Sequence, residues 1–229
     1  MLWATAGARF TVIEEEAGDP EPCVVAWSDP EDEDPPGYGY SAGVLSVTGT
    51  VPEVVLTPEA DGALGVGYTS NLPDEVETLL PSGGALLTVT AEGGSDIGPY
   101  TQVLQTPEPV VLVAPATGLE GLGFATASTG SPMQVSWNPG NGDSIVVSLS
   151  PIGSDFQVEA GYGLACTLAG DGGEATLPQW ALEEVRDGSS KRRVALGVTR
   201  VKSRTDEVSG GSVSVGATRS YVGLLDLKP

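Results

Sequence analysis

Few side chains in this sequence could carry catalysis. There is no histidine, which excludes serine–histidine–aspartate and cysteine–histidine sites and removes the usual general base near neutral pH. A serine–lysine pair would need a buried lysine with a lowered pKa. The candidate Ser190–Lys191 stands beside Arg192 and Arg193, and such a run of like charges indicates a solvated loop. We therefore expect no catalytic residue of these classes.

Paired carboxylates are the remaining catalytic chemistry. Glycoside hydrolysis needs only two acidic side chains held about 5 to 9.5 Å apart, and the chain has 31 aspartates and glutamates. With so many acids some pair always meets that distance, so the count by itself indicates nothing. Binding clefts are usually lined by apolar and aromatic side chains, and aromatic residues make up 6% of this sequence. A carboxylate-based carbohydrate-active enzyme is kept as an alternative function.

The densest cluster of acids lies in residues 29–34, where five of the six side chains are carboxylates. Calcium favours clustered carboxylates, but the regular Asp-x-Asp-x-Asp-Gly spacing is missing here, and a solvated charged segment is the favoured interpretation. The glycine pairs 83–84 and 93–94 precede expected strands rather than helices, so they form no phosphate-binding loop. We expect neither a metal nor a cofactor.

The charge of the chain is divided very unevenly along the sequence. Residues 1–185 contain 27 acids and a single basic residue, Arg9, a net charge of −26. Residues 186–229 contain nine basic and four acidic residues, a net charge of +5. We predict an interaction edge formed by the cations Arg186, Lys191, Arg192, Arg193, Arg200, Lys202 and Arg204.

Two interpretations of this basic edge are open. It could be an edge strand that its charges protect from unwanted strand pairing. It could instead meet an acidic surface, such as that of a neighbouring copy, because ends of opposite sign can associate head to tail. Nucleic acid is excluded as a partner, since a body at −26 repels it and the basic segment lacks interleaved aromatic residues.

Cys23 and Cys166 are the two cysteines, and they form neither a Cys-x-x-Cys motif nor a zinc-binding spacing. In an oxidising compartment they could pair as a disulfide, whereas in the cytosol they would be buried small apolar residues. Residues 1–7 show no basic segment followed by a long apolar one, so we expect no leader within this chain, and a leader removed ahead of this start is the alternative. No run approaches the roughly 20 apolar residues of a membrane helix, so no transmembrane segment is expected.

The elements expected to position these groups are almost all strands. Glycine and proline, 32 and 18 residues, are too frequent for long helices, and short segments alternate between apolar and polar residues with a period of two. The pattern predicts a hairpin of residues 133–137 and 144–149 around a turn at 138–143, with Trp137 in the core. It also predicts a strand covered on both faces at 110–113 and one short helix at 178–185.

We therefore predict an all-β fold of two antiparallel β-sandwich, immunoglobulin-like domains in tandem. The proline-rich stretch that ends near Pro115 is the natural border, which gives an N-terminal domain of residues 1–115 and a C-terminal domain of residues 116–229. A single larger sandwich is the alternative.

Several short sequences follow one another in an order similar to that in a group of known proteins. They are Glu21-Pro22-Cys23-Val24, residues 41–49, Gly98-Pro99-Tyr100, Gln134-Val135-Ser136-Trp137, Cys166, Asp171-Gly172-Gly173 and Leu177-Pro178. The chain resembles the uncharacterised secreted or lipid-anchored two-domain β-sandwich proteins of predatory soil bacteria. The resemblance implies an extracytoplasmic location, secreted, periplasmic or at the cell surface, and supplies no catalytic residues. The chain differs from them in lacking a leader and a lipid-attachment cysteine near its start.

These observations together favour a non-catalytic secreted or cell-surface structural and interaction module that binds a protein or surface partner. A self-assembling filament or coat subunit, held together by the acidic body and the basic edge, is a second alternative beside the carbohydrate-active enzyme.

Overall fold

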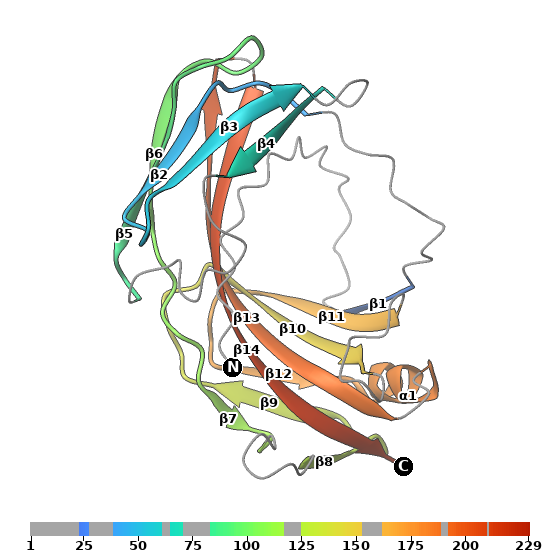
Figure 1. Cartoon of the computed structure of the whole chain (residues 1–229). Helices are drawn as coiled ribbons and strands as arrows, with labels where there is room; N and C mark the ends of the chain where they lie inside the picture. Colours follow the sequence, from blue (N-terminus) through green and yellow to red (C-terminus); the bar gives the residue numbers. More distant parts are fainter. Residues whose placement is uncertain are drawn as a thin grey trace.

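The computed structural model describes residues 23–27, 39–60, 65–70, 83–116, 125–152, 162–188, 192–209 and 211–229. These residues form fourteen strands and one helix, so the predicted all-β fold is confirmed. Their strands form three sheets, whose pairs are antiparallel apart from β14 and β8 (Figure 1).

A five-stranded sheet forms the upper part of the molecule in Figure 1. Its strands, in spatial order, are β4 (Val66–Ser70), β3 (Val54–Ala60), β2 (Leu45–Thr48), β5 (Leu86–Ala91) and β6 (Tyr100–Gln105). The lower part contains a six-stranded and a three-stranded sheet. The six strands are β1 (Cys23–Trp27), β11 (Tyr162–Ala169), β10 (Ser144–Pro151), β13 (Arg193–Val208), β14 (Gly211–Lys228) and β8 (Ala125–Ser128). The three are β12 (Glu174–Leu177), β9 (Met133–Trp137) and β7 (Leu112–Ala114).

Strands β13 and β14 form one long ribbon that joins the two parts (Figure 1). They contain 16 and 18 residues and pair continuously from Arg193 opposite Asp226 to Val208 opposite Gly211. One end of the ribbon buries Val194 and Leu225 in a core with strands of the lower sheets. The other end buries apolar residues of β14 in a second core, beneath the five-stranded sheet. Alternate residues of both strands face these cores because side chains alternate across a strand.

The predicted border at residues 115 and 116 does not separate the two cores. Strand β1, from the N-terminal half, is the edge of the six-stranded sheet, and β7, which ends at Ala114, belongs to the three-stranded sheet. Val213 and Val215, from the C-terminal half, pack in the core of the five-stranded sheet. Each core is therefore built from both halves, and the arrangement of two sandwiches in tandem is not confirmed.

The predicted hairpin of residues 133–137 and 144–149 is wrong. Both segments are strands, but β9 pairs with β12 and β7, whereas β10 pairs with β11 and β13. Val135 and Trp137 of β9 therefore share one core with Ile145 and Val147 of β10 across the space between the sheets. An alternating strand looks the same in sequence whether its neighbour lies beside it or opposite it, so periodicity could not separate the two arrangements. The predicted burial of Trp137 is confirmed, with 3% of its surface exposed.

The apolar run at residues 110–113 is not covered on both faces. Strand β7 is the edge of the three-stranded sheet, and Val111 and Val113 are 57% and 68% exposed. Val110, by contrast, is buried in the core. The prediction of a covered strand from the continuous apolar run is therefore wrong, because β7 is an edge strand.

The short helix predicted at residues 178–185 is present as α1 (Gln179–Gly188). Pro178 stands immediately before it, where the missing N–H and the fixed φ favour a helix start. Ala181, Leu182 and Val185 lie one turn apart or less and are buried in the lower core, whereas Trp180 is 47% exposed. No helix in the described part of the chain is long and apolar enough to cross a membrane.

Candidate functional site

The predicted basic edge is largely used for contacts within the fold. The Arg186 guanidinium pairs with Asp187 at 2.7 Å and donates to the Thr129 hydroxyl at 2.6 Å. Lys202 pairs with Asp143 at 2.7 Å and Arg204 with Asp206 at 2.9 Å.

The other cations of the edge lie in different environments. Arg193 begins β13, opposite Asp226, and Arg192 before it is exposed with a φ of 56°. Lys191 lies outside the described residues. Arg200 is fully buried and therefore does not belong to an exposed surface.

Arg200 is the centre of a buried polar cluster, which we call the Arg200 cluster. Its Nε donates to Asp171 Oδ2 at 2.5 Å, and its terminal nitrogens donate to the backbone oxygens of Glu108, Pro109 and Asn138 at 2.6 to 2.9 Å. These contacts tie β13 to the segment before β7 and to the connection after β9. Exposed side-chain fractions of 0% for Arg200 and 2% for Asp171 leave no access for a substrate, so the cluster holds structure.

The glycines of residues 138–143 are required by the closeness of Arg200. A Cβ at Gly140 would collide with Arg200 Cζ, and one at Gly142 would lie 2.7 Å from Arg200 Cγ. Neither glycine is among the described residues with positive φ. Space, rather than backbone conformation, selects glycine at these two positions.

Asp171 satisfies three donors in the Arg200 cluster. Besides Arg200, the indole Nε1 of Trp137 donates to Asp171 Oδ1 at 2.8 Å and the Gly142 amide to Oδ2 at 3.3 Å. Burial raises the pKa of the Asp171 carboxyl, but the hydrogen bonds from Arg200 and Trp137 and the charge of Arg200 outweigh it. The pKa therefore lies below its ordinary value of 3.8.

We expect the fold to lose stability in acid through Asp171. Because its pKa is lowered on folding, the contribution of Asp171 is fully present above its unfolded pKa near 3.8 and is lost as the pH falls through the folded value. Urea unfolding at a series of pH values between 5 and 2 measures this loss. Asp171→Asn should reduce the slope of unfolding free energy against pH by up to about 1.4 kcal/mol per pH unit. An unchanged slope would show that Asp171 does not titrate in this way.

The outward side of three strands in the five-stranded sheet has an unusual composition. Inward positions such as Leu45, Leu87 and Leu104 are buried in the upper core. The alternate positions, which point the other way, carry no charged side chain. We call them the β2–β5–β6 face: Ser46, Thr48, Leu86, Thr88, Thr90, Thr101, Val103 and Gln105.

The β2–β5–β6 face is ordered by strand register and partly apolar. Ser46, Thr90 and Thr101 lie opposite one another across the three strands, and so do Thr48, Thr88 and Val103 in the next row. Leu86 is 63% exposed and Val103 is 43% exposed. Although the chain carries a net charge of −21, this face combines uncharged side chains with two exposed aliphatic residues.

Sequence reasoning did not identify the β2–β5–β6 face. The apolar half of the alternating residues 85–91 marks the core. The polar half, Thr88 and Thr90, carries hydroxyls in place of the acids that are common elsewhere. The lack of acids in the polar half of such a strand is the signal in the sequence that indicates this face.

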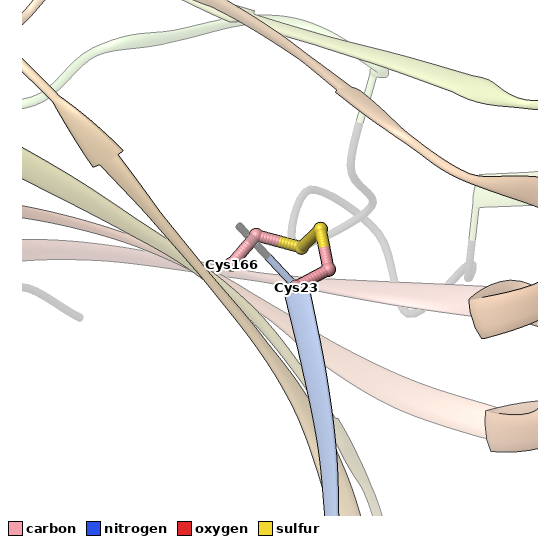
Figure 2. The surroundings of a disulfide bond; sticks show 2 residues. All are labelled: Cys23 and Cys166. Atoms are coloured by element: carbon pink, nitrogen blue, oxygen red, sulfur yellow. A yellow bond between two sulfur atoms is a disulfide. The ribbon is translucent and has the colours of Figure 1, made fainter. Parts of the chain in front are cut away.

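The structure joins Cys23 and Cys166 in a disulfide. Figure 2 shows the bond between β1 and β11, where the two residues are direct partners in the antiparallel register. Cys23 is 7% and Cys166 is 1% exposed. The bond closes a loop between residues that are 143 positions apart.

The acidic run at residues 29–34 lies outside the described residues. Within the described ranges no group of three or more cysteine, aspartate or glutamate side chains is arranged to hold a metal ion.

No protein-family model, curated protein or solved structure matches the chain. Its function is therefore argued from its own residues.

Proposed function

We propose that the chain is a non-catalytic structural and interaction module that works outside the reducing cytoplasm and binds a protein or surface partner. The observation that carries the proposal is the β2–β5–β6 face. The disulfide between Cys23 and Cys166 supports the location, because disulfides persist mainly in oxidising compartments.

The chemistry of the β2–β5–β6 face favours a partner surface that is itself uncharged. Exposed Leu86 and Val103 lose contact with water when covered, which favours association. The rows of hydroxyls around them can donate and accept hydrogen bonds, so no polar group needs to be left unpaired in the interface. None of the eight residues of the face is a carboxylate, although the chain has a net charge of −21, so a partner that contacts these residues meets no negative charge on them.

The upper core gives this face a firm support. Gln102 on the inward side of β6 is 2% exposed, and its Nε2 donates to the Val213 carbonyl at 3.2 Å. This bond ties the five-stranded sheet to the β13–β14 ribbon. A face held in one geometry loses little conformational entropy on binding.

We expect the double variant Leu86→Glu, Val103→Glu to lose binding at least about tenfold, because two added charges would be buried against the partner at a cost above roughly 1.4 kcal/mol. Binding is measured by co-sedimentation with a cell-envelope preparation from the organism that produces the protein. Both positions are exposed, so the fold should tolerate the change, and thermal unfolding checks this.

The matched control is Val111→Glu, Val113→Glu, which adds the same two charges at one exposed valine immediately before β7 and one within it. This control should bind as the wild type does. Undiminished binding by the Leu86, Val103 variant would contradict the proposed face. Equal loss in both variants would show a general effect of charge.

A further inference from the structure

Strand β1 is an insertion from a distant part of the chain. The other five strands of the six-stranded sheet, β8, β10, β11, β13 and β14, all lie between Ala125 and Lys228. β1 comes from Cys23–Trp27 and occupies the edge beside β11. The sheet is therefore completed by a segment that ends 98 positions before the first of the other five strands.

The edge of β11 is a strand-binding site that β1 already fills. The two strands pair through five consecutive positions, from Cys23 opposite Cys166 to Trp27 opposite Tyr162. Such pairing uses backbone donors and acceptors, so the same sequence from a second copy would fit this edge equally well. Exchange of one identical element between copies is a low-cost route to self-association.

The disulfide decides whether the β11 edge holds β1 of its own chain or β1 of a second copy. With Cys23 bonded to Cys166 of the same chain, β1 cannot leave the edge. With the bond open, β1 is held by five residue pairs and by its tether. A tethered strand competes at an effective concentration in the millimolar range, which a concentrated protein can approach.

We propose that the β11 edge binds β1 of a second copy of this chain when the Cys23–Cys166 disulfide is opened, so that the disulfide acts as a latch on self-association. The exchanged pair is then joined by Cys23 of one copy and Cys166 of the other. This inference concerns the lower sheets and is independent of the β2–β5–β6 face.

The chemistry requires only a small thiol and no net oxidation. A small thiolate attacks one sulfur of the disulfide, forms a mixed disulfide with one cysteine and releases the other as a thiolate. β1 then leaves, and β1 of a second copy takes its place. The free cysteine thiolate of one copy attacks the mixed disulfide of the other, forms the intermolecular bond and releases the small thiol.

The test mixes equal amounts of unlabelled and uniformly ¹⁵N-labelled wild-type protein with reduced and oxidised glutathione. Glutathione, with urea below the unfolding transition where needed, is increased until glutathione adducts appear on Cys23 or Cys166. After trapping and digestion, mass spectrometry reads the disulfide-linked peptides. We expect mixed-isotope Cys23–Cys166 peptides whose fraction rises with protein concentration, and a species of twice the 23.3 kDa chain mass. Omitting glutathione should abolish both.

Two results would overturn the inference. Adducts without mixed-isotope peptides, even at about millimolar protein, would show that β1 returns only to its own chain. Cys23–Cys23 and Cys166–Cys166 peptides in amounts similar to Cys23–Cys166 would show random pairing of unfolded chains instead of exchange at the β11 edge.

Discussion

We expect Arg200→Met to lower the free energy of unfolding by about 3–5 kcal/mol, because removing one partner of a buried ion pair leaves an uncompensated charge. Asp171, 2% exposed at its side chain, would keep only Trp137 and Gly142 as donors. The carbonyls of Glu108, Pro109 and Asn138 would lose their charged donor as well. Equilibrium urea unfolding of wild type and variant measures the difference.

The chain offers a matched control for Arg200 on the same strand. Lys202 pairs with Asp143 at 2.7 Å, but the two side chains are 24% and 44% exposed. Since exposed pairs typically contribute under about 1 kcal/mol, Lys202→Met should have a small effect. A loss for Arg200→Met no larger than that for Lys202→Met would contradict the structural role of the Arg200 cluster.

A double variant separates the ion pair from simple packing. Replacing Asp171 by asparagine in the Arg200→Met background removes the buried negative charge while keeping an acceptor for Trp137. If the carboxylate is the source of the loss, the two changes together should cost less than the sum of the single changes, by about 0.5–3 kcal/mol. Strict additivity would indicate that Arg200 and Asp171 act separately.

The sequence indicated the class of the fold but not its connections. Alternation correctly predicted that residues 133–137 and 144–149 are strands and that Trp137 is buried, and Pro178 correctly indicated the start of the helix. Alternation reports only which side of a strand is buried. It could not show that β9 and β10 face each other across a core, or that one ribbon, β13–β14, serves two cores.

For the candidate sites too, the sequence shows which residue types are present, whereas only the fold shows where their side chains lie. The concentration of cations after residue 185 was visible in the sequence, but Arg200 differs from its exposed neighbours only through the segments that close over it. Alternation places Arg200 on the same side of β13 as the buried Val194, Leu196 and Val198. It could not show that a charged side chain there would be closed over by Gly140 and Gly142 and held by partners from distant segments. Such contacts depend on residues that lie far apart in sequence.

The second large effect concerns the disulfide. We expect Cys23→Ala, Cys166→Ala to lower the free energy of unfolding by about 5 kcal/mol, because the bond closes a loop of 143 residues and so restricts the unfolded chain strongly. Alanine leaves no unpaired polar group in the buried site. Urea unfolding at low micromolar protein, where exchange between copies is negligible, gives the value, and wild type in a reducing agent should unfold like the variant.

The part of the fold that loses protection when the disulfide is removed tests the prediction as well as the size of the stability loss does. β1 is an edge strand, and the next strand in sequence, β2, lies in the five-stranded sheet, so the variant should lose protection at β1 first. We expect hydrogen exchange to become faster at the β11 amides that face β1, between Tyr162 and Cys166, while the β10–β13 pairing stays protected. Reducing agent added to the double alanine variant should change nothing, which controls for effects unrelated to the bond. A free energy of unfolding within about 1 kcal/mol of the wild-type value would contradict this expectation. It would show that β1 and β11 stay close in the unfolded chain without the disulfide, so that the disulfide adds little restraint on β1.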